Sequence, residues 1–514
     1  MSTVSADGGE VLVAIDVGTS GARASAFELA GTPVAQVRRP YPTALPAEGW
    51  AEQDARRWQT ASVSALAGLV RELGPRYRVE AIGITGQCPS VVPVDGAGVP
   101  LRPGIIYRDN RAVAEAAEIC ARFGAREAHV LTGHVPAAFH VAAKILWIRA
   151  HEPEVFAATR RFLQPSDCVV LALTGETATD WTMAAATALL DLQGRRWATG
   201  LLAGLDLDPE LLPPLHPSWG VAGALRPALA RRMGIAANGT GGDAAIPVVA
   251  GAGDSIACAV GAGVTAPGPV SEMAGSSTCL NSVVAAPLAD LDVTHYPSAV
   301  DDHGYVTEVG INTTGEALDW VVQLFYSGPD RRPRPADYAR MDRDAAAMPP
   351  GADGLLFAPV LGDGERDDPD LRGAVTGLSL RHDHRAWARA ALEGVALGIR
   401  ARLETLERAS TPTTELRVSG GGAALAAWNQ IKADVLGIPV VRVAGDATAA
   451  GAALLAGIGT GVYRDAAEAT AAGYRPAARV EPCPRHAEQY GEIYARYRSL
   501  LGSPVVRMDR PKED

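Results

Sequence analysis

The chain has 514 residues, of which 47% are hydrophobic and 20% charged, and its formal net charge is -11. This length exceeds what one hydrophobic core supports, so we expect a globular protein of two large domains. The negative net charge disfavours a nucleic-acid binder or a binder of anionic membranes, and no apolar run is long enough to cross a bilayer.

The N-terminal stretch, the cysteines and the lysines indicate where the protein is located and which kinds of binding site it lacks. The N-terminal stretch MSTVSADGGE is polar, and the six cysteines are scattered without a CxxC pair, so we expect a cytoplasmic protein without a zinc site or disulfide framework. Lysine occurs only at Lys144, Lys432 and Lys512, and no GxxxxGK[ST] segment exists, which excludes a P-loop. If phosphates bind here, backbone amides, hydroxyls and a metal must hold them.

The first predicted element is VLVAIDVGTSGARASAFE, residues 11–28, in which two strands (11–17 and 23–29) flank a turn of small residues. Burying an unpaired charge is costly, yet this predicted strand carries Asp16 near its end. Glycine lets a backbone approach phosphate oxygens, and hydroxyls add donors, so Gly18, Thr19 and Ser20 suit a phosphate. We interpret the turn as a site for phosphate and a metal ion.

Helical patterns at 54–73, 111–122 and 140–151 then alternate with a strand at 79–84, which predicts an α/β fold. The second glycine-rich element, VVAGAGDSIACAVGAG at 248–263, carries Asp254 at the end of a strand. Asp254 is either a functional acid or the N-cap of the helix that follows it. We place a domain boundary near residues 257–267.

Beyond this boundary, VSEMAGSSTCLNSVV (270–284) repeats the opening pattern of strand, small turn and strand, which suggests a duplicated architecture with a cleft between two halves. A long helical pattern covers 385–409, and strands are predicted at 415–418 and 439–443. Between these strands, LRVSGGGAALAAWNQIKADVLG (416–437) places three glycines before a helix, whose N-terminus favours an anion. Taken alone, each of the four glycine-rich elements (residues 16–21, 248–263, 275–278 and 416–437) is typical of an ordinary turn. Together, the four elements favour phosphoryl transfer.

These motifs resemble those of the FGGY family of carbohydrate kinases, with a layout most similar to the xylulokinases. The resemblance runs from about residue 11 to 500 and keeps the family's order. Its segments are AIDVGTSGAR, GWAEQD (49–54), IGITGQ (82–87), RPGIIYRDNR (102–111), KILWIRAHEPEVF (144–156), LTGETATDWTMAAATALLDL (173–192), VVAGAGDSIACAVGAG, ALEGVALGIRARLE, RVSGGGAALAAWNQIKADVLGIPV and DATAAGAALLAGIG (446–459).

The resemblance implies an α/β fold of two ribonuclease-H-like domains of the actin/hexokinase type that close over a cleft. We expect an N-terminal domain at 11–257 for the sugar and catalytic base and a C-terminal domain at 258–502 for the nucleotide, with tails at 1–10 and 503–514. The implied cofactors are ATP and Mg. The implied partners are a sugar or polyol substrate, without nucleic acid or membrane, and the resemblance allows a homodimer.

The family likeness also assigns roles by position. Asp16 falls at the Mg, through water, and Asp254 falls on the catalytic base. The ATP-binding positions are Gly18, Thr19, Ser20, Gly275, Ser276, Ser277, Thr278, Gly310, Thr314, Gly420, Gly421, Gly422 and Asn429. The substrate-binding positions are Gln87, Cys88, Pro89, Asp109, Arg111 and Asp254.

Substrate choice is where the chain departs from the family. Xylulokinases carry Met-His after the glutamine of GxxxQ and glycerol kinases carry Arg-Glu, whereas this chain has Cys88-Pro89. Proline has no side-chain donor, and Cys88 is interpreted as a small buried hydrophobe. The sequence therefore predicts an ATP-dependent kinase of a ketopentose (xylulose-like) or related sugar or polyol. The alternative is a sugar- and nucleotide-binding sensor on the same fold without transfer activity.

Overall fold

The computed structural model describes residues 9–235, 245–288, 290–362, 364–365, 368, 370–408 and 412–507. The chain divides into two compact units. The first consists of Met1–Thr265, Val283–Thr307 and Asp446–Tyr474, and the second consists of Ala266–Ser282, Glu308–Gly445 and Arg475–Asp514. Each unit is therefore built from separate stretches of the sequence.

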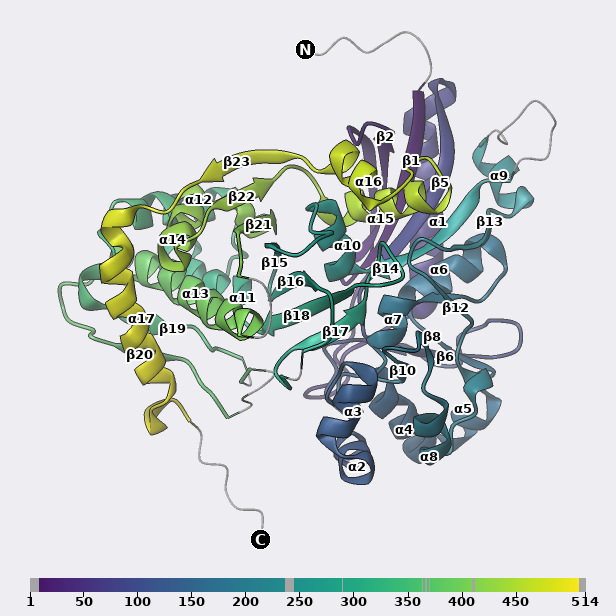
Figure 1. Cartoon of the computed structure of the whole chain (residues 1–514), viewed down its shortest axis with the longest axis horizontal. Helices are drawn as coiled ribbons and strands as arrows, with labels where there is room; N and C mark the ends of the chain where they lie inside the picture. The colour runs from purple at the N-terminus through teal and green to yellow at the C-terminus, as the bar shows by residue number, and fades with distance from the viewer. Residues whose placement is uncertain are drawn as a thin grey trace. The chain divides into compact units, whose positions relative to one another are not determined.

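A six-stranded mixed sheet forms the framework of the first unit, and its first strands are drawn in purple (Figure 1). Strands β1 and β2 form an antiparallel hairpin, β3 extends it, and β5 and β14 run parallel to β1 on its other side. In order, the strands are β13 (Val221–Ala224), β14 (Pro247–Gly253), β5 (Tyr77–Gly86), β1 (Gly9–Gly18), β2 (Gly21–Glu28) and β3 (Pro33–Pro40).

Both faces of β1 are buried, which explains why its sequence reads as an almost continuous apolar run. Val11, Val13 and Ile15 pack with Trp58 of α1 and the apolar residues of α6, whereas Leu12 and Ala14 pack with α10 and α15 on the other face. Asp16 follows in the alternation of Leu12 and Ala14. The acid at the end of β1 thus lies on the face covered by α10 and α15.

Helices of the first unit cover the sheet or build a lobe around α2–α5 and α8. They are α1 (Ala55–Leu73), α2 (Val113–Phe123), α3 (Ala125–Thr132), α4 (Val141–His151), α5 (Pro153–Ala158), α6 (Pro165–Thr174), α7 (Trp181–Ala185), α8 (Thr199–Gly204), α9 (Pro227–Met233), α10 (Asp254–Gly261), α15 (Ala447–Gly459) and α16 (Ala466–Gly473). Short strand pairs link the lobe: β4 (Glu52–Gln53) with β7 (Gly104–Ile105), β6 (Val92–Val94) with β8 (Arg161–Leu163), β9 (Thr179–Asp180) with β12 (Leu215–His216), and β10 (Leu190–Asp191) with β11 (Arg196–Trp197).

The second unit repeats this plan with a second mixed sheet. The seven strands of this sheet are, in order, β17 (Thr294–Pro297), β18 (Tyr305–Ile311), β16 (Thr278–Val284), β15 (Pro269–Ala274), β21 (Glu415–Gly420), β22 (Val440–Val443) and β23 (Pro476–Val480). Its remaining elements are α11 (Gly315–Val322), α12 (Pro335–Ala346), α13 (His384–Glu407), α14 (Ala426–Leu436), α17 (Ala487–Leu501) and the hairpin of β19 (Leu356–Ala358) with β20 (Ala374–Thr376).

Five strands of the first sheet have counterparts in the second, as the predicted duplication requires. The hairpin β15–β16 matches β1–β2, because both pairs are antiparallel. Strand β21 runs parallel to β15 as β5 does to β1, and β22 runs parallel to β21 as β14 does to β5. The outer strands β13 and β23 are both antiparallel to their neighbours. Each unit thus begins with the same hairpin and places a glycine-rich turn at its tip.

The units do not follow the expected division into residues 11–257 and 258–502. Helix α10 continues through residue 257, and the chain enters the second unit at Ala266. Residues 446–474 then return to the first unit, because α15 packs closely on α10: a Cβ at Gly451 would lie 1.7 Å from the Ala257 carbonyl oxygen. Small residues in both helices permit this approach.

The tails expected at residues 1–10 and 503–514 are only partly covered by the described residues. Residues 1–8 and 508–514 of these tails lie outside the described residues. Gly9 and Glu10 instead begin β1, and Pro504–Val506 form a 3-10 helix.

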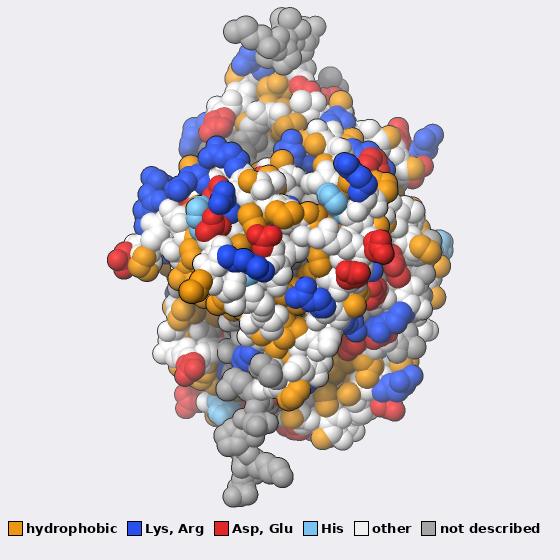
Figure 2. All heavy atoms as spheres, turned by 90° about the vertical axis from the view of Figure 1, so that its left-hand side faces the viewer, with side chains coloured by type: hydrophobic (Ala, Val, Ile, Leu, Met, Phe, Trp, Pro, Cys, Tyr) orange, Lys and Arg blue, Asp and Glu red, His pale blue; other side chains and the backbone are white. Residues whose placement is uncertain are grey.

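The surface carries mixed charge on the face drawn in Figure 2. Lys and Arg side chains are interspersed there with Asp and Glu side chains, and hydrophobic side chains lie between them. No helix in the described part of the chain combines the length and apolar character that a membrane crossing requires.

Candidate functional site

The β1–β2 turn brings together Asp16, Gly18, Thr19 and Ser20, as their spacing predicts. The tip is held by contacts to its carbonyl groups: the Tyr41 hydroxyl donates to the Gly18 oxygen at 2.6 Å, and Gln53 Nε2 donates to the Thr19 oxygen at 2.8 Å. The turn is therefore held by hydrogen bonds that its backbone carbonyl oxygens accept.

Asp16 is 5% exposed and is flanked by opposite charges. Arg23 lies 3.5 Å from its carboxylate and 2.7 Å from Asp446, which caps α15. Burial raises the pKa of Asp16 to about 6, against the lowering influence of Arg23 and Arg38. Burial outweighs the nearby arginines in its effect on the pKa of Asp16. A cation bound beside this carboxylate would therefore stabilise its charged form.

The donor set around Asp16 fits magnesium bound mainly through water and phosphate. Within the described residues, no three His, Cys, Asp or Glu side chains converge as a metal site. Mg²⁺ is commonly held by only one or two carboxylates, together with waters and substrate phosphates. One acid beside a phosphate-type turn is thus sufficient for this ion.

Gln53 is a connecting residue that the sequence prediction omitted, although it lies within GWAEQD. Its Nε2 donates to Thr19 and to the Thr43 hydroxyl, and its Oε1 accepts hydrogen bonds from Trp58 Nε1 (2.7 Å) and Gln87 Nε2 (2.8 Å). Because the amide is 2% exposed, these bonds fix its position. Gln53 therefore couples the phosphate-type turn to Gln87 of the predicted sugar segment.

The predicted sugar segment Gln87-Cys88-Pro89 lies beside the strand that carries Asp254. The Cys88-Pro89 peptide bond is cis. A Cβ at Gly253 would lie 2.9 Å from Cys88 Sγ, so the thiol packs directly against the end of β14. Cys88 is half-buried, which is less than its interpretation as a small buried hydrophobe requires.

Lys144 joins this segment to the second predicted sugar segment. Its Nζ donates to the carbonyl oxygens of Pro89 (3.0 Å) and Ile106 (2.9 Å). The side chain is fully buried, and burial lowers the pKa of the amine to about 7. Lys144 thus holds residues 88–89 and 106–111 in one arrangement.

Asp109 and Arg111 are buried against each other. Asp109 Oδ1 accepts from Arg111 Nε at 2.8 Å, and Oδ2 accepts from Arg111 Nη2 and from the Ala51 amide, each at 2.6 Å. The Arg111 guanidinium also stacks on Trp50, 3.7 Å from the ring centroid. This pair therefore braces the segment that carries Tyr107 and Arg108, and its predicted contact with a sugar stays a prediction.

Asp254 is the first residue of α10, and Gly253 occupies the cap position, so the interpretation of Asp254 as an N-cap is wrong. Its Oδ1 accepts from the Ser255 amide at 2.8 Å. The Gly253 amide donates to the Thr182 hydroxyl at 3.0 Å, and that hydroxyl donates to Asp180 at 2.8 Å. The Asp180–Thr182 pair consequently fixes the backbone immediately before Asp254.

In the second unit, the turn Gly275–Thr278 is seated on the start of α11. The amides of Thr314 and Glu316 donate to the Ser276 oxygen at 3.1 Å, and the hydroxyls of Thr278 and Thr314 are 2.9 Å apart. A Cβ at Gly315 would lie 2.2 Å from the Gly275 oxygen. The turn therefore has a fixed shape, and Gly310 lies within β18, shortly before Thr314 in sequence.

The triple glycine of the second unit links β21 to α14 through a 3-10 helix, Gly421–Ala424. Gly420 has a φ of 86°, and a Cβ there would lie 2.5 Å from the Ala274 oxygen. Asn429 Nδ2 donates to the Ala423 oxygen at 2.9 Å, while its buried Oδ1 has no hydrogen-bond partner among the described residues. The predicted order of strand, glycines and helix is confirmed.

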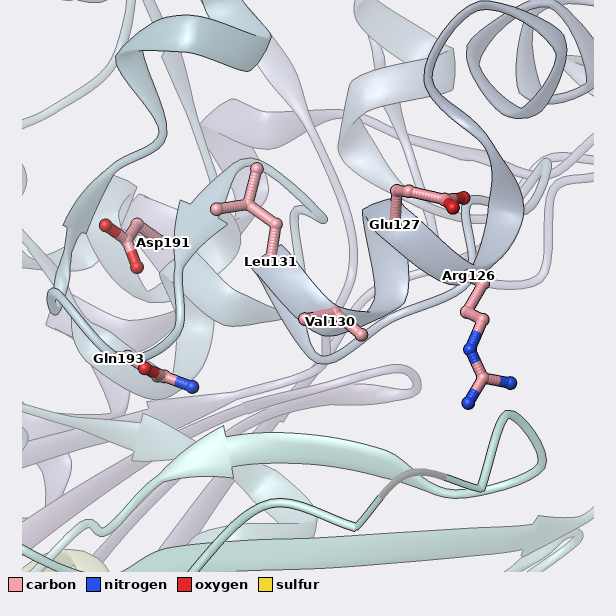
Figure 3. Close-up of a pocket in the computed structure, with 6 residues that line it drawn as sticks. All are labelled: Arg126, Glu127, Val130, Leu131, Asp191 and Gln193. Carbon is pink, nitrogen blue, oxygen red and sulfur yellow. The ribbon is translucent and has the colours of Figure 1, made fainter.

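A hollow elsewhere in the first unit shares none of the predicted site residues. It has a volume of about 430 Å³ and lies between α3 and the β10–β11 hairpin. Its lining residues are Arg126, Glu127, Val130, Leu131, Asp191 and Gln193 (Figure 3). Neither Asp16 nor Asp254 lines this hollow, so the hollow is not part of the predicted catalytic site.

Comparison with known proteins covers almost the whole chain. Residues 11–261 match the N-terminal domain of the FGGY family of carbohydrate kinases, and residues 271–460 match its C-terminal domain. The xylulose kinase of Escherichia coli (strain K12) is 31% identical, across 87% of this chain and 89% of that protein.

Two further similarities bear on fold and substrate. The crystal structure of xylulose kinase from Rhodospirillum rubrum superposes with a TM-score of 0.87 at 32% identity, covering 96% of this chain and 99% of that chain. The gluconokinase of Bacillus subtilis (strain 168) is 28% identical, across 84% of this chain and 83% of that protein.

Proposed function

The chain belongs to the FGGY family of carbohydrate kinases, and we propose that it phosphorylates a hydroxyl of a ketopentose of the xylulose type, or of a related sugar or polyol. Its matches define it as an ATP-dependent sugar kinase similar to the xylulokinases. The resemblance and the two-domain α/β fold of the actin/hexokinase type are both confirmed, and both large sheets are mixed.

The observation that carries the substrate proposal is the position of Cys88 against Gly253. It places the segment that differs between family members one residue from Asp254. In our proposal, Asp254 orients the sugar hydroxyl and accepts its proton late, because a carboxylate with an ordinary pKa of about 3.9 is a weak base. Thr182 and Asp180 support this role by fixing the preceding amide.

We assign Asp16 to the magnesium ion, and the ion would neutralise charge on the transferred phosphoryl group when bound. In the first unit, Gly18, Thr19 and Ser20 would bind phosphate. In the second unit, the proposed ATP-binding residues are Gly275, Ser276, Ser277, Thr278, Gly310, Thr314, Gly420, Gly421, Gly422 and Asn429. The residues from Gly275 to Thr314 would supply the close approach and the donors that phosphates require, whereas Gly420, Gly421, Gly422 and Asn429 would hold the adenosine.

The acceptor is expected to contact Gln87 and the short, uncharged Cys88-Pro89 pair. The relatives include kinases named for xylulose and for gluconate, so the family alone leaves several acceptor classes. A donor-poor pair selects by shape rather than by hydrogen bonds. The names of these relatives give no support to the sensor alternative.

An acceptor panel tests the proposal. ADP release with MgATP would be measured for ketopentoses, ketohexoses, tetritols, glycerol and gluconate, with the product mass recorded to separate transfer from hydrolysis. We expect one strongly preferred acceptor that gains a phosphoryl group. Nucleotide and sugar binding without transfer to any acceptor would contradict the proposal.

A further inference from the structure

Lysine, the residue that binds phosphate in a P-loop, is scarce in this chain. Lys144 and Lys432 are fully buried, and Lys432 is paired with Glu272 at 2.6 Å. Lys512 lies outside the described residues. A cation that faces the β1–β2 turn must therefore be an arginine.

The strand register places two arginines in line with Asp16. Asp16 on β1 is directly opposite Arg23 on β2, and Arg23 is directly opposite Arg38 on β3. Residues directly opposite one another in antiparallel strands share a face of the sheet. Asp16, Arg23 and Arg38 therefore form one row that crosses three strands beside the turn.

The two arginines have different partners. Arg23 is neutralised by Asp16 and Asp446. Arg38 is exposed, and in the described part of the chain it forms no ion pair. Its guanidinium instead extends to the tip of the turn, where Nη2 donates to Ser20 Oγ at 2.7 Å and lies 3.4 Å from the Ser20 carbonyl oxygen. Arg38 thus presents at the turn a charge that only the more distant influence of Asp16 offsets.

An anion at this position would resolve an unfavourable arrangement. Like charges directly opposite each other on neighbouring strands destabilise a sheet, and the nearby acids are already committed to Arg23. A guanidinium carries five donors, so it can keep its bond to Ser20 and still bind a phosphate oxygen.

We propose that Arg38 is a further phosphate-binding residue, which supplies positive charge to the polyphosphate of the bound nucleotide at the Thr19-Ser20 tip. This inference rests on the proposed nucleotide function of that turn. Arg38 lies on β3, outside the recognised sequence motifs. It would supply the positive charge that a P-loop lysine supplies in other nucleotide-binding proteins.

The neighbouring Arg39 provides a matched control. Its side chain leaves the same strand toward α1, where Nε donates to the Ser64 hydroxyl at 3.2 Å, and Nη1 donates to the Arg38 carbonyl oxygen at 2.9 Å. R39Q therefore removes one positive charge from β3 without removing the guanidinium beside Ser20.

The test measures R38Q, R38K and R39Q in the full chain. Calorimetry with inorganic tripolyphosphate and magnesium, and separately with adenosine, would isolate phosphate affinity. Because R38Q removes charged donors to a phosphate oxygen, we expect it to weaken tripolyphosphate binding and to raise KM for MgATP at least tenfold. Adenosine affinity, KM for the sugar and kcat should stay within about twofold, and R38K should recover part of the loss.

Two results would overturn the inference. One is unchanged tripolyphosphate affinity in R38Q relative to R39Q. The other is an R38Q variant that loses kcat and thermal stability with an unchanged KM for MgATP, since that pattern describes a brace for the turn. Calorimetry does not require turnover. A wild-type chain without transfer activity would contradict the proposed function, but the tripolyphosphate affinities of R38Q and R39Q could still be compared.

Discussion

Lys144 connects two segments of the proposed sugar site through one buried amino group. Neither the Pro89 nor the Ile106 carbonyl lies near it in sequence, so the contact depends on tertiary structure. Burial favours the neutral amine and outweighs the opposing influence of the Asp109 carboxylate on its pKa. Its protonation should therefore be coupled to folding.

This coupling predicts a pH dependence of stability. The pKa of Lys144 is about 7 in the folded chain and 10.5 ordinarily, so the unfolded chain binds an extra proton between these values. The free energy of unfolding should therefore rise with pH from about 7 toward 10.5, by on the order of 5 kcal/mol in total. Urea unfolding at several pH values, for wild type and K144M, measures this.

K144M should flatten that slope, whatever its stability at a single pH. Equal slopes for both proteins between pH 7.5 and 9.5 would show that Lys144 is protonated in the folded state, against this account.

The positions of residues were predictable where a motif places a residue at or beside a turn, and their contacts were not predictable where distant parts of the chain decide them. Asp16 and Ser20 lie at the predicted tip. Asp109 and Arg111 instead engage each other and the Ala51 amide, a contact made across the chain. Gln53 was missed because nothing local indicates that one amide links Thr19 and Gln87.

At the scale of elements, the glycines after β21 have unequal structural roles. Gly420 needs its positive φ and its missing Cβ, because Ala274 lies against it. At Gly421, by contrast, a Cβ would have no described heavy atom within 4 Å. The fold therefore requires glycine at the first position but not at the second.

If Gly421 approaches bound adenosine, G421A should raise the dissociation constant for MgATP about tenfold, or ~1.4 kcal/mol, without lowering the melting temperature. G420A should lower the melting temperature, because it combines strain with a clash. Nucleotide calorimetry and thermal unfolding of both variants measure these effects. A G421A protein with wild-type nucleotide affinity would count against adenosine at this position.

Element boundaries followed from caps and periodicity to within a few residues. The predicted helix at 54–73 begins at Ala55 after the cap Asp54, and that at 140–151 begins at Val141 after His140. Asp254 was ambiguous because an acid before an apolar helix suits both a cap and the first turn. The structure resolves this by placing Gly253 at the cap.

On the scale of the whole molecule, the duplication was visible in the two hairpins, but the return of α15 to the first unit was not. Its alanine- and glycine-rich sequence indicates close packing without naming the partner. The partner is α10, whose Ala257 carbonyl lies where a Cβ of Gly451 would project. A homodimer and a cytoplasmic location stay predictions.

G451A should therefore destabilise the first unit by about 3 kcal/mol or more, because a methyl group would overlap a backbone oxygen. G491A in α17 is the matched control, since a Cβ there meets no described heavy atom within 4 Å. That substitution should leave stability unchanged or raise it by up to ~1 kcal/mol. Thermal unfolding of the two variants would decide, and equal melting temperatures would refute the packing argument.

The central claim is that Asp254 acts as the base in phosphoryl transfer to a sugar. The measurement that tests it most directly is the transfer rate of D254A with MgATP and the preferred acceptor, alongside nucleotide affinity by calorimetry. We predict a fall in kcat of about a thousandfold with MgATP binding retained, because a positioned general base contributes roughly 10²–10⁴-fold. Transfer at the wild-type rate by D254A would contradict the account.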